Sequence, residues 1–154
     1  PFAVVLADDL CISRNNNLLM KMNEVYKKYQ CSVIAIEEIP IEKTNSYGII
    51  SGELIDGTKD IFLVKDMVEK PEPKDAPSNL GIIGRYILTP EIFNILRDTK
   101  PDKKGEIQIT DALRTQAKNG KVIAYKFKGE RFDCGSVEGY VKAINFLAKE
   151  KNLI

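Results

Sequence analysis

The sequence contains no histidine, and this absence excludes several kinds of site. A zinc centre with histidine ligands and a serine or cysteine triad with a histidine base both need a residue that this chain lacks. The three cysteines, Cys11, Cys31 and Cys134, are an odd number without the paired spacing of a metal site. We expect reduced thiols, for which a cytoplasmic location is the simplest setting.

Charge and hydropathy argue against two further classes of partner. The chain has 23 basic and 22 acidic residues, so its net charge of +1 creates no field that would attract a nucleic acid polymer or an anionic membrane. No segment approaches the roughly 18 consecutive apolar residues of a membrane-spanning helix. We therefore expect neither kind of partner, and a bound anion must be held by a local group of residues.

The first half of the chain reads as a strand, a helix and a strand. Residues 1–9 are apolar and end in two carboxylates, Asp8 and Asp9. Residues 15–17 offer a helix cap before a helical pattern that runs to about Tyr29, and residues 31–36 read as a second buried strand. This order predicts an α/β fold, in which ligands collect at the carboxyl ends of parallel strands, where Asp8 and Asp9 would lie.

The second half repeats the alternation. Residues 48–52 and 61–64 read as short strands of an antiparallel excursion, and three prolines mark residues 71–79 as a stiff loop. Further strands are expected over residues 80–88 and 122–127, with helices after Pro90, from Thr110 to Asn119 and after Ser136. The last helix carries a broad apolar stripe, so we expect it to pack on the sheet, on a segment outside this chain or on another subunit. The stripe consists of Val137, Tyr140, Val141, Ile144, Phe146 and Leu147.

Six segments together resemble one enzyme family. They are Leu6-Ala7-Asp8-Asp9, Tyr47-Gly48, Val68-Glu69-Lys70-Pro71, Ile83-Gly84-Arg85-Tyr86, Gly105-Glu106-Ile107-Gln108-Ile109-Thr110-Asp111 and Phe132-Asp133-Cys134-Gly135. Each is weak alone, but in this order and spacing they are similar to the bacterial UTP:glucose-1-phosphate uridylyltransferases, also called UDP-glucose pyrophosphorylases. The resemblance implies a three-layer α/β/α nucleotidyltransferase (Rossmann-like) fold with a mixed, mainly parallel sheet. Residues 1–154 would be the C-terminal portion of a single such domain.

The resemblance also implies a reaction. Uridylyl transfer from UTP to glucose 1-phosphate gives UDP-glucose and pyrophosphate when a sugar phosphate oxygen attacks the α-phosphate in line. Positioning and neutralisation of charge supply most of the rate in such a displacement, so no histidine base is needed. By the resemblance, Asp8 and Asp133 hold Mg²⁺ and form the catalytic set with Lys70. Asp9 is either a further ligand or a supporting carboxylate.

The same resemblance assigns the sugar side of the site. It implies that Glu69 accepts hydrogen bonds from sugar hydroxyls, that Lys70 neutralises the sugar phosphate, and that Tyr47, Gly48 and Gly84 contact the sugar. Neighbouring side chains on a strand point to opposite faces, so Glu69 and Lys70 share one site only if the strand ends there.

Each assignment has a plainer alternative from the residues alone. A solvated ion pair would explain Glu69 and Lys70, and simple turns or bulges would explain Gly48 and Gly84. A cap or a structural turn would explain Asp8 and Asp133. The resemblance leaves the roles of Glu106, Gln108 and Asp111 open, because helix capping explains Thr110 and Asp111 as well.

One departure from the family pattern is expected to matter. The glycine-rich loop and the residues that read uracil in such enzymes are not found in these 154 residues. We therefore expect this chain to be the later part of a larger enzyme, inactive alone, with the full-length protein a homo-oligomer. Two alternatives stay open: a related nucleotidyltransferase that uses another nucleotide such as dTTP, and a noncatalytic module that binds a sugar nucleotide.

Overall fold

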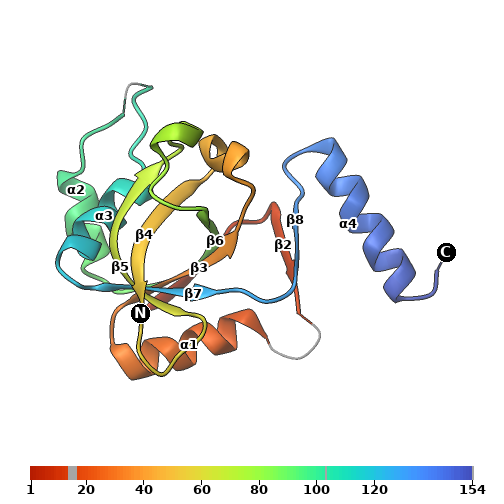
Figure 1. Ribbon diagram of the computed structural model, residues 1–154, viewed down its shortest axis with the longest axis horizontal. Helices are drawn as coiled ribbons and strands as arrows, with labels where there is room; N and C mark the ends of the chain where they lie inside the picture. The colour runs from red at the N-terminus through yellow and green to blue at the C-terminus, as the bar shows by residue number, and fades with distance from the viewer. Residues whose placement is uncertain (14–16, 103, 154) are drawn as a thin grey trace.

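The computed structural model describes residues 1–13, 17–102 and 104–153 (Figure 1). Six strands form one sheet in the order β1-β6-β3-β7-β5-β4, and β2 pairs with β8 in a second, two-stranded sheet. The strands are β1 (Phe2–Val5), β2 (Asp9–Ile12), β3 (Ser32–Glu38), β4 (Gly48–Leu54), β5 (Ile61–Glu69), β6 (Leu80–Leu88), β7 (Val122–Lys126) and β8 (Glu130–Asp133). The α-helices are α1 (Leu18–Tyr29), α2 (Ile92–Asp98), α3 (Ile109–Lys118) and α4 (Val137–Glu150).

The main sheet is mixed, as predicted, but it has fewer parallel pairings than the expected mainly parallel sheet. Among the described strands only β3 and β7 pair in parallel, whereas β1–β6, β3–β6, β4–β5, β4–β6 and β5–β7 are antiparallel. The reason is that β6 lies between β1 and β3 and runs against both. Hydropathy patterns identify the strands but not their neighbours, so this insertion was not predictable from the sequence.

Helices cover both faces of the main sheet, which confirms the three-layer α/β/α architecture (Figure 1). Apolar residues of α1, including the fully buried Met22, pack on one face. Residues of α2 and α3, including Ile92 and Leu113, pack on the other. Full burial of a side chain of this size stabilises the fold by about 1.5–3 kcal/mol relative to its exposure, so this packing fixes the sheet.

Helix α1 begins where the sequence predicts. The Asn17 side chain accepts hydrogen bonds from the backbone N–H groups of Leu19 and Met20, which satisfies two donors of the first turn. The other two residues of the predicted cap, Asn15 and Asn16, lie outside the described part of the chain. The helix ends at Tyr29, as predicted.

The first strand is shorter than expected. Strand β1 ends at Val5, a turn follows, and Asp9 begins β2, which pairs with β8 rather than with the main sheet. Strands β4 and β5 form the predicted antiparallel pair, but β5 also pairs with β7, so they belong to the main sheet. The chain therefore leaves the main sheet just before its first two carboxylates.

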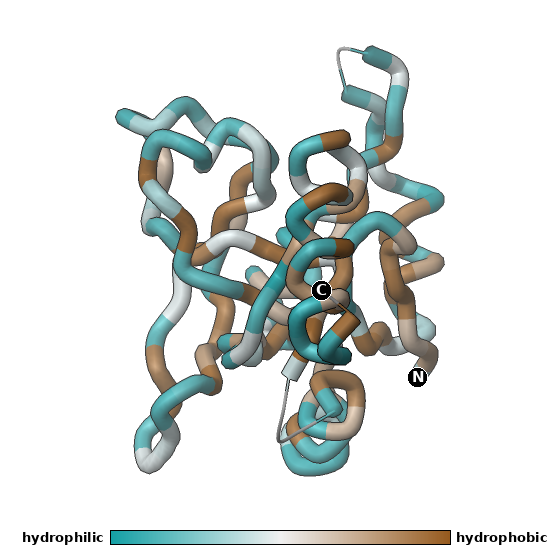
Figure 2. Tube along the Cα trace, turned by 90° about the vertical axis from the view of Figure 1, so that its right-hand side faces the viewer, coloured by the Kyte–Doolittle hydropathy of each residue, from teal (hydrophilic) through white to brown (hydrophobic). Residues whose placement is uncertain are grey.

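Helix α4 extends away from the main sheet (Figure 1). Its Phe146 ring lies 5.2 Å from the Phe132 ring of β8. Four residues of the predicted apolar stripe, Val137, Tyr140, Val141 and Ile144, are each about half exposed or more, so this part of the stripe does not pack on the sheet. Figure 2, seen from the side of α4, shows hydrophobic and hydrophilic residues following each other along the helix.

No helix in residues 1–13, 17–102 and 104–153 combines the length and the apolar character that crossing a membrane requires.

Candidate active site

The two-stranded sheet brings the predicted metal carboxylates together. Asp9, the first residue of β2, pairs with Asp133, the last residue of β8, and Asp8 directly precedes the pair. The backbone N–H of Cys134 donates to the Asp8 carbonyl oxygen at 2.7 Å. Asp8 and Asp133 are therefore adjacent in space although 124 residues separate them in the sequence.

The space beside Gly135 shows how the two carboxylates face each other. A Cβ atom at Gly135 would lie 3.1 Å from Asp133 Oδ1 and 3.2 Å from Asp8 Oδ2, so both oxygens border one small space. The backbone N–H of Gly135 also donates to Asp133 Oδ1 at 3.0 Å. Asp8 and Asp133 are both exposed, so a ligand can reach them.

This donor set fits Mg²⁺. Magnesium takes hard oxygen ligands and keeps several waters, so one or two carboxylates together with substrate phosphates are sufficient. The described residues contain no group of three or more acidic or thiol side chains that could enclose a metal ion. The pair at Asp8 and Asp133 would thus leave most coordination positions to water and substrate.

Asp9 is placed differently from its neighbour Asp8. Its side chain is only 9% exposed, and both of its oxygens are engaged within the protein. Oδ2 accepts a hydrogen bond from the backbone N–H of Gly84 at 2.8 Å, and Oδ1 accepts one from Arg131 Nε at 2.6 Å. Of the two roles that the sequence left open for Asp9, this geometry favours a supporting carboxylate.

Gly84 is explained by the same contact. A Cβ atom there would lie 2.6 Å from both Asp9 Oδ2 and Leu6 Cβ, which is closer than real side chains approach. The segment that carries the carboxylates therefore approaches the Gly84 backbone too closely for any larger residue. Contact with a sugar at this position stays a prediction.

The start of β4 and the end of β5 bring four of the predicted sugar-side residues together, all except Gly84. Gly48 pairs with Glu69, and β5 ends at Glu69 because Lys70 takes a left-handed conformation with φ 48°. The Lys70 N–H donates to the Tyr47 carbonyl oxygen at 2.9 Å. Lys70 Nζ lies 3.6 Å from Glu69 Oε1, so both charged groups reach one side of the strand end.

Thr110 is a functional candidate that the sequence did not resolve. Its side chain donates to Glu69 Oε2 at 2.6 Å, and the residue is only 6% exposed. The capping explanation for Thr110 is wrong, since the residue lies inside α3 and its hydroxyl holds Glu69 instead. In the preceding loop, Gln108 Nε2 donates to Asp102 and to Glu106.

Arg131 was missed by the sequence reasoning. Its side chain is 8% exposed and, besides Asp9, it donates to Glu37 Oε1 at 2.8 Å and to the Tyr47 hydroxyl at 3.0 Å. Burial alone would lower the pKa of Arg131, but the Tyr47 hydrogen bond and the carboxylates of Asp9 and Glu37 raise it overall. Arg131 is therefore charged at every physiological pH.

Nothing local in the sequence marks Arg131 as buried, because its partners lie 84 to 122 residues away. The only available signal was its place two residues before Asp133.

The Arg85 side chain holds the segment that carries Asp8 and Asp9 by donating to backbone carbonyl oxygens. It donates through Nη1 to the Leu6 and Gly84 carbonyl oxygens at 3.1 and 2.8 Å, and through Nη2 to the Asp9 carbonyl oxygen. These bonds hold the turn between β1 and β2 against β6.

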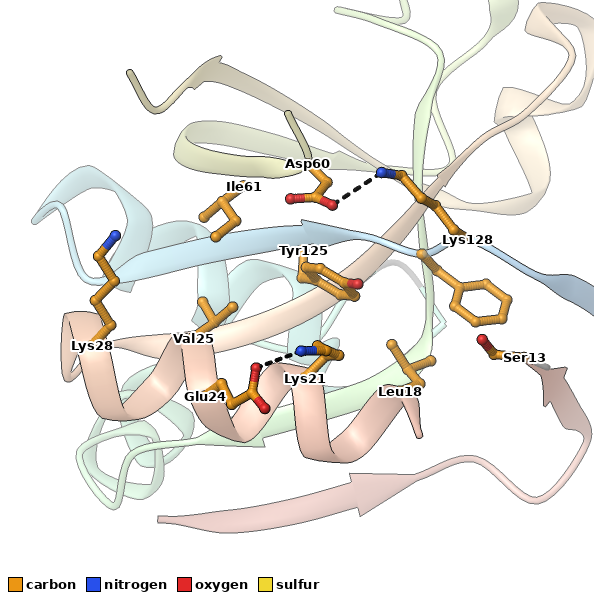
Figure 3. A pocket seen from close by; sticks show the side chains of 11 residues that line it. Ser13, Leu18, Lys21, Glu24, Val25, Lys28, Asp60, Ile61, Tyr125 and Lys128 are labelled. Carbon is orange, nitrogen blue, oxygen red and sulfur yellow. Dashed lines mark hydrogen bonds and ion pairs between the residues drawn. The ribbon is translucent and has the colours of Figure 1, made fainter. Parts of the chain in front are cut away.

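A separate pocket of about 430 Å³ lies between α1, β5 and β7 (Figure 3). Apolar side chains such as Val25 and Ile61 line part of it, and two ion pairs, Lys21–Glu24 and Lys128–Asp60, border it. None of the residues predicted for the active site lines this pocket. The candidate site is instead the exposed region around the carboxylate pair and the β4–β5 strand ends.

Comparison with known proteins shows the family of the chain. The nucleotidyl transferase family matches residues 1–150. A UTP–glucose-1-phosphate uridylyltransferase of Pseudomonas aeruginosa is 60% identical over 147 residues, which are 95% of this chain and 52% of that protein.

Two solved structures are also similar. A crystal structure of UDP-glucose pyrophosphorylase complexed with UDP-glucose is 59% identical with a TM-score of 0.92, covering 97% of this chain and 56% of that one. A UTP-bound UDP-glucose pyrophosphorylase from Acinetobacter baumannii is 35% identical with a TM-score of 0.84, covering 97% and 51%. The chain spans about half the length of these relatives.

Proposed function

This chain belongs to the nucleotidyl transferase family, and we propose that it carries the sugar-phosphate side of the active site of a UTP:glucose-1-phosphate uridylyltransferase. The observation that carries the proposal is the 60% identity to the Pseudomonas enzyme of that name over 95% of this chain. The proposed substrates are UTP and glucose 1-phosphate, and the proposed products are UDP-glucose and pyrophosphate.

The proposed reaction is a single in-line displacement. A phosphate oxygen of glucose 1-phosphate forms a bond to the α-phosphorus of UTP, while the bond from that phosphorus to the oxygen bridging to the β-phosphate breaks and pyrophosphate leaves. Nucleophile and electrophile are both anions, so the protein must hold them in line and offset their repulsion. Neither a covalent intermediate nor a histidine is required.

Glu69 and Lys70 divide the binding of the sugar phosphate in this proposal. The Lys70 side chain is 58% exposed, so its ammonium group is free to turn from Glu69 toward a phosphate. Thr110 fixes one carboxylate oxygen of Glu69 and leaves the other for sugar hydroxyls. A Cβ atom at Gly48 would lie 3.2 Å from Glu69 Oε2, so glycine keeps the space beside this carboxylate open.

Asp8 and Asp133 would hold Mg²⁺ in this proposal. The ion supplies positive charge that stabilises the phosphates as they react. Asp9 does not bind substrate here but fixes the segment that carries Asp8. Tyr47 and Gly84 are proposed to border the sugar, Tyr47 with its hydroxyl held by Arg131 and Gly84 with its N–H held by Asp9.

The two alternative functions are less well supported. The similar proteins at 59–60% identity carry names that specify UTP or UDP-glucose rather than a thymidine nucleotide. A noncatalytic module would not require Asp8, Asp133 and Lys70 together, and this chain has all three. The three free cysteines are consistent with the proposed cytoplasmic location. The proposed homo-oligomer of the full-length protein would be tested by sedimentation.

The proposal is tested by binding and turnover measured on one preparation. We expect the 154-residue chain to bind UDP-glucose more tightly with Mg²⁺ than with EDTA, by calorimetry. We expect no pyrophosphate release from UTP and glucose 1-phosphate.

Asp8→Asn and Asp133→Asn should each lower the magnesium-dependent gain about tenfold or more. Asp56→Asn, at an exposed turn, is the matched control and should not change it. A gain that persists in both site variants would refute the assignment of the carboxylates.

A further inference from the structure

The metal carboxylates and the sugar-side residues lie on different parts of the fold, and one buried side chain touches both. We propose that Arg131 is a positioning residue that couples the Asp8–Asp133 carboxylate pair to the sugar side of the site, an inference that rests on the proposed function. Arg131 lies two residues before Asp133 on β8 and opposite Cys11 of β2. It is not itself placed to contact the substrate, because its side chain is 8% exposed and its guanidinium is occupied by protein groups.

On the carboxylate side, Arg131 acts through Asp9. Its Nε donates to Asp9 Oδ1 at 2.6 Å, and Asp9 is covalently next to Asp8 and directly paired with Asp133. The two-stranded sheet shares no strand pairing with the main sheet in the described residues. Its position therefore depends on contacts of this kind, and a shift of Asp9 would move both metal carboxylates together.

On the sugar side, Arg131 acts through Tyr47. Its Nη1 donates to the Tyr47 hydroxyl at 3.0 Å, and its guanidinium lies 5.1 Å from the centre of the Tyr47 ring. The Tyr47 carbonyl oxygen accepts from the Lys70 N–H, and the next residue, Gly48, pairs with Glu69. Tyr47 is thus held by Arg131 at its hydroxyl and by Lys70 at its backbone.

Glu37 anchors Arg131 to the main sheet, between its contacts with Asp9 and Tyr47. It lies on β3 in the middle of the main sheet and accepts from Arg131 Nη1 at 2.8 Å. A guanidinium is planar and holds its donors in a rigid fork, so fixing one edge sets the direction of the others. A shift of the two-stranded β2–β8 sheet would therefore require Arg131 to release Tyr47 or Glu37. The buried guanidinium would then lack a hydrogen-bond acceptor.

This connection predicts that the metal and the sugar nucleotide bind cooperatively through the protein, beyond any direct contact between them. Coupling between two sites is reciprocal, and it falls when the element that joins them is loosened. Tyr47→Phe is the sharpest variant because it removes one hydroxyl and keeps the ring. Tyr26→Phe is the matched control, because Tyr26 lies on α1 against the apolar cluster of the main sheet, whereas Arg131 donates to Asp9, Glu37 and Tyr47.

The experiment compares UDP-glucose affinity at saturating Mn²⁺ with that in EDTA, by calorimetry on the 154-residue chain. The ratio of the two affinities is the metal-dependent gain. We expect Tyr47→Phe to reduce this gain about fivefold or more and Tyr26→Phe to leave it at the wild-type value. A direct contact between Mn²⁺ and the diphosphate is the same in both variants, so a selective loss reports on the Arg131 connection.

Arg131→Lys provides a second measurement. Lysine keeps the charge but cannot bind three acceptors in a fork, so we expect the gain to fall at least as far as in Tyr47→Phe, with Mn²⁺ affinity measured by electron paramagnetic resonance lowered as well. A circular dichroism melt checks that this variant folds, and if it does not, Tyr47→Phe decides alone.

The possible failures are distinguishable. A wild-type gain in Tyr47→Phe would overturn the coupling and leave the proposed function intact. A wild-type chain that binds no UDP-glucose would contradict both.

Discussion

The main sheet and the two-stranded sheet are held in place by different interactions. Central strands of the main sheet are buried on both faces, under α1 on one side and α2 and α3 on the other. The β2–β8 sheet is attached to β6 and β3 largely by charged and polar contacts, in which Asp9, Arg85 and Arg131 take part. Of the proposed metal carboxylates, Asp133 lies on this second sheet and Asp8 directly precedes it.

This difference shows that one kind of interaction stabilises the fold, whereas another sets the orientation of the site residues. Apolar burial is strong but has no preferred direction, so it stabilises the main sheet without fixing the orientation of any one group. Hydrogen bonds to a buried guanidinium are directional, and much of their energy offsets the cost of removing charges from water. The hydrogen bonds of Arg131 are therefore suited to orient the carboxylates rather than to stabilise the chain.

The largest expected effect is in the apolar layer. Leu113 on α3 is fully buried, so Leu113→Ala should lower the free energy of unfolding by about 2–5 kcal/mol, measured by urea denaturation. Leu54→Ala is the control with the same chemical change at a side chain that is 48% exposed. It should cost about 0.5 kcal/mol or less, and equal losses in the two variants would contradict the assignment of the main core.

A smaller effect is expected where β6 of the main sheet contacts the segment that leads into β2. Gly84→Ala would place a methyl group against Asp9 and Leu6, so we expect a loss of about 1–3 kcal/mol in urea denaturation. Hydrogen exchange should also quicken in β2 and β8 more than in β3 and β7. At Gly81 on the same strand, the nearest atoms to an added Cβ belong to the Ile39 side chain, 3.2 Å away, so Gly81→Ala should cost less. A larger loss of unfolding free energy in Gly81→Ala than in Gly84→Ala would show that Gly84 is not closely packed against Asp9 and Leu6.

The smallest effect is expected for a partly exposed ion pair between α3 and β5. Arg114 donates to Asp66 and lowers the pKa of that carboxyl. A lowered folded-state pKa means that the pair contributes stability above the ordinary Asp pKa of about 3.9, and that this contribution is lost as the pH falls through the folded-state value.

Both side chains of this pair are 40% exposed, so we expect Asp66→Asn to cost less than about 1 kcal/mol at pH 7. The difference from wild type should shrink at pH 3, in urea denaturation at both values. A difference that grows on acidification would mean that the pair does not stabilise the charged form.

Much of the fold was predictable because it follows from local patterns. The α1 helix with its Asn17 cap, the glycine-containing strand β6 and the strand β7 all lie where periodicity and capping residues place them. Strands β2 and β8 were not predicted. Each has four residues, and each becomes a strand by pairing with a segment more than 100 residues away.

The candidate site divides in the same way. Residue types and spacing, read through the family resemblance, named Asp8, Asp133, Glu69 and Lys70 as candidates. They did not show that Asp9 faces inward, that Thr110 holds Glu69, or that Arg131 joins the two sides. These contacts depend on side chains from distant segments, which no local pattern records.

The sequence by itself determined the helices and most strands of the main sheet, that no histidine chemistry is possible, and which charged residues are candidates for binding an anion and a metal ion. Only the tertiary structure decided the strand order, the separation of the carboxylates onto their own sheet and the burial of Arg131 between Asp9, Glu37 and Tyr47. The physical reason is the distance along the sequence over which each interaction acts. Periodicity and capping act within a few residues, whereas strand pairing and buried charge networks form only when distant parts of the chain meet.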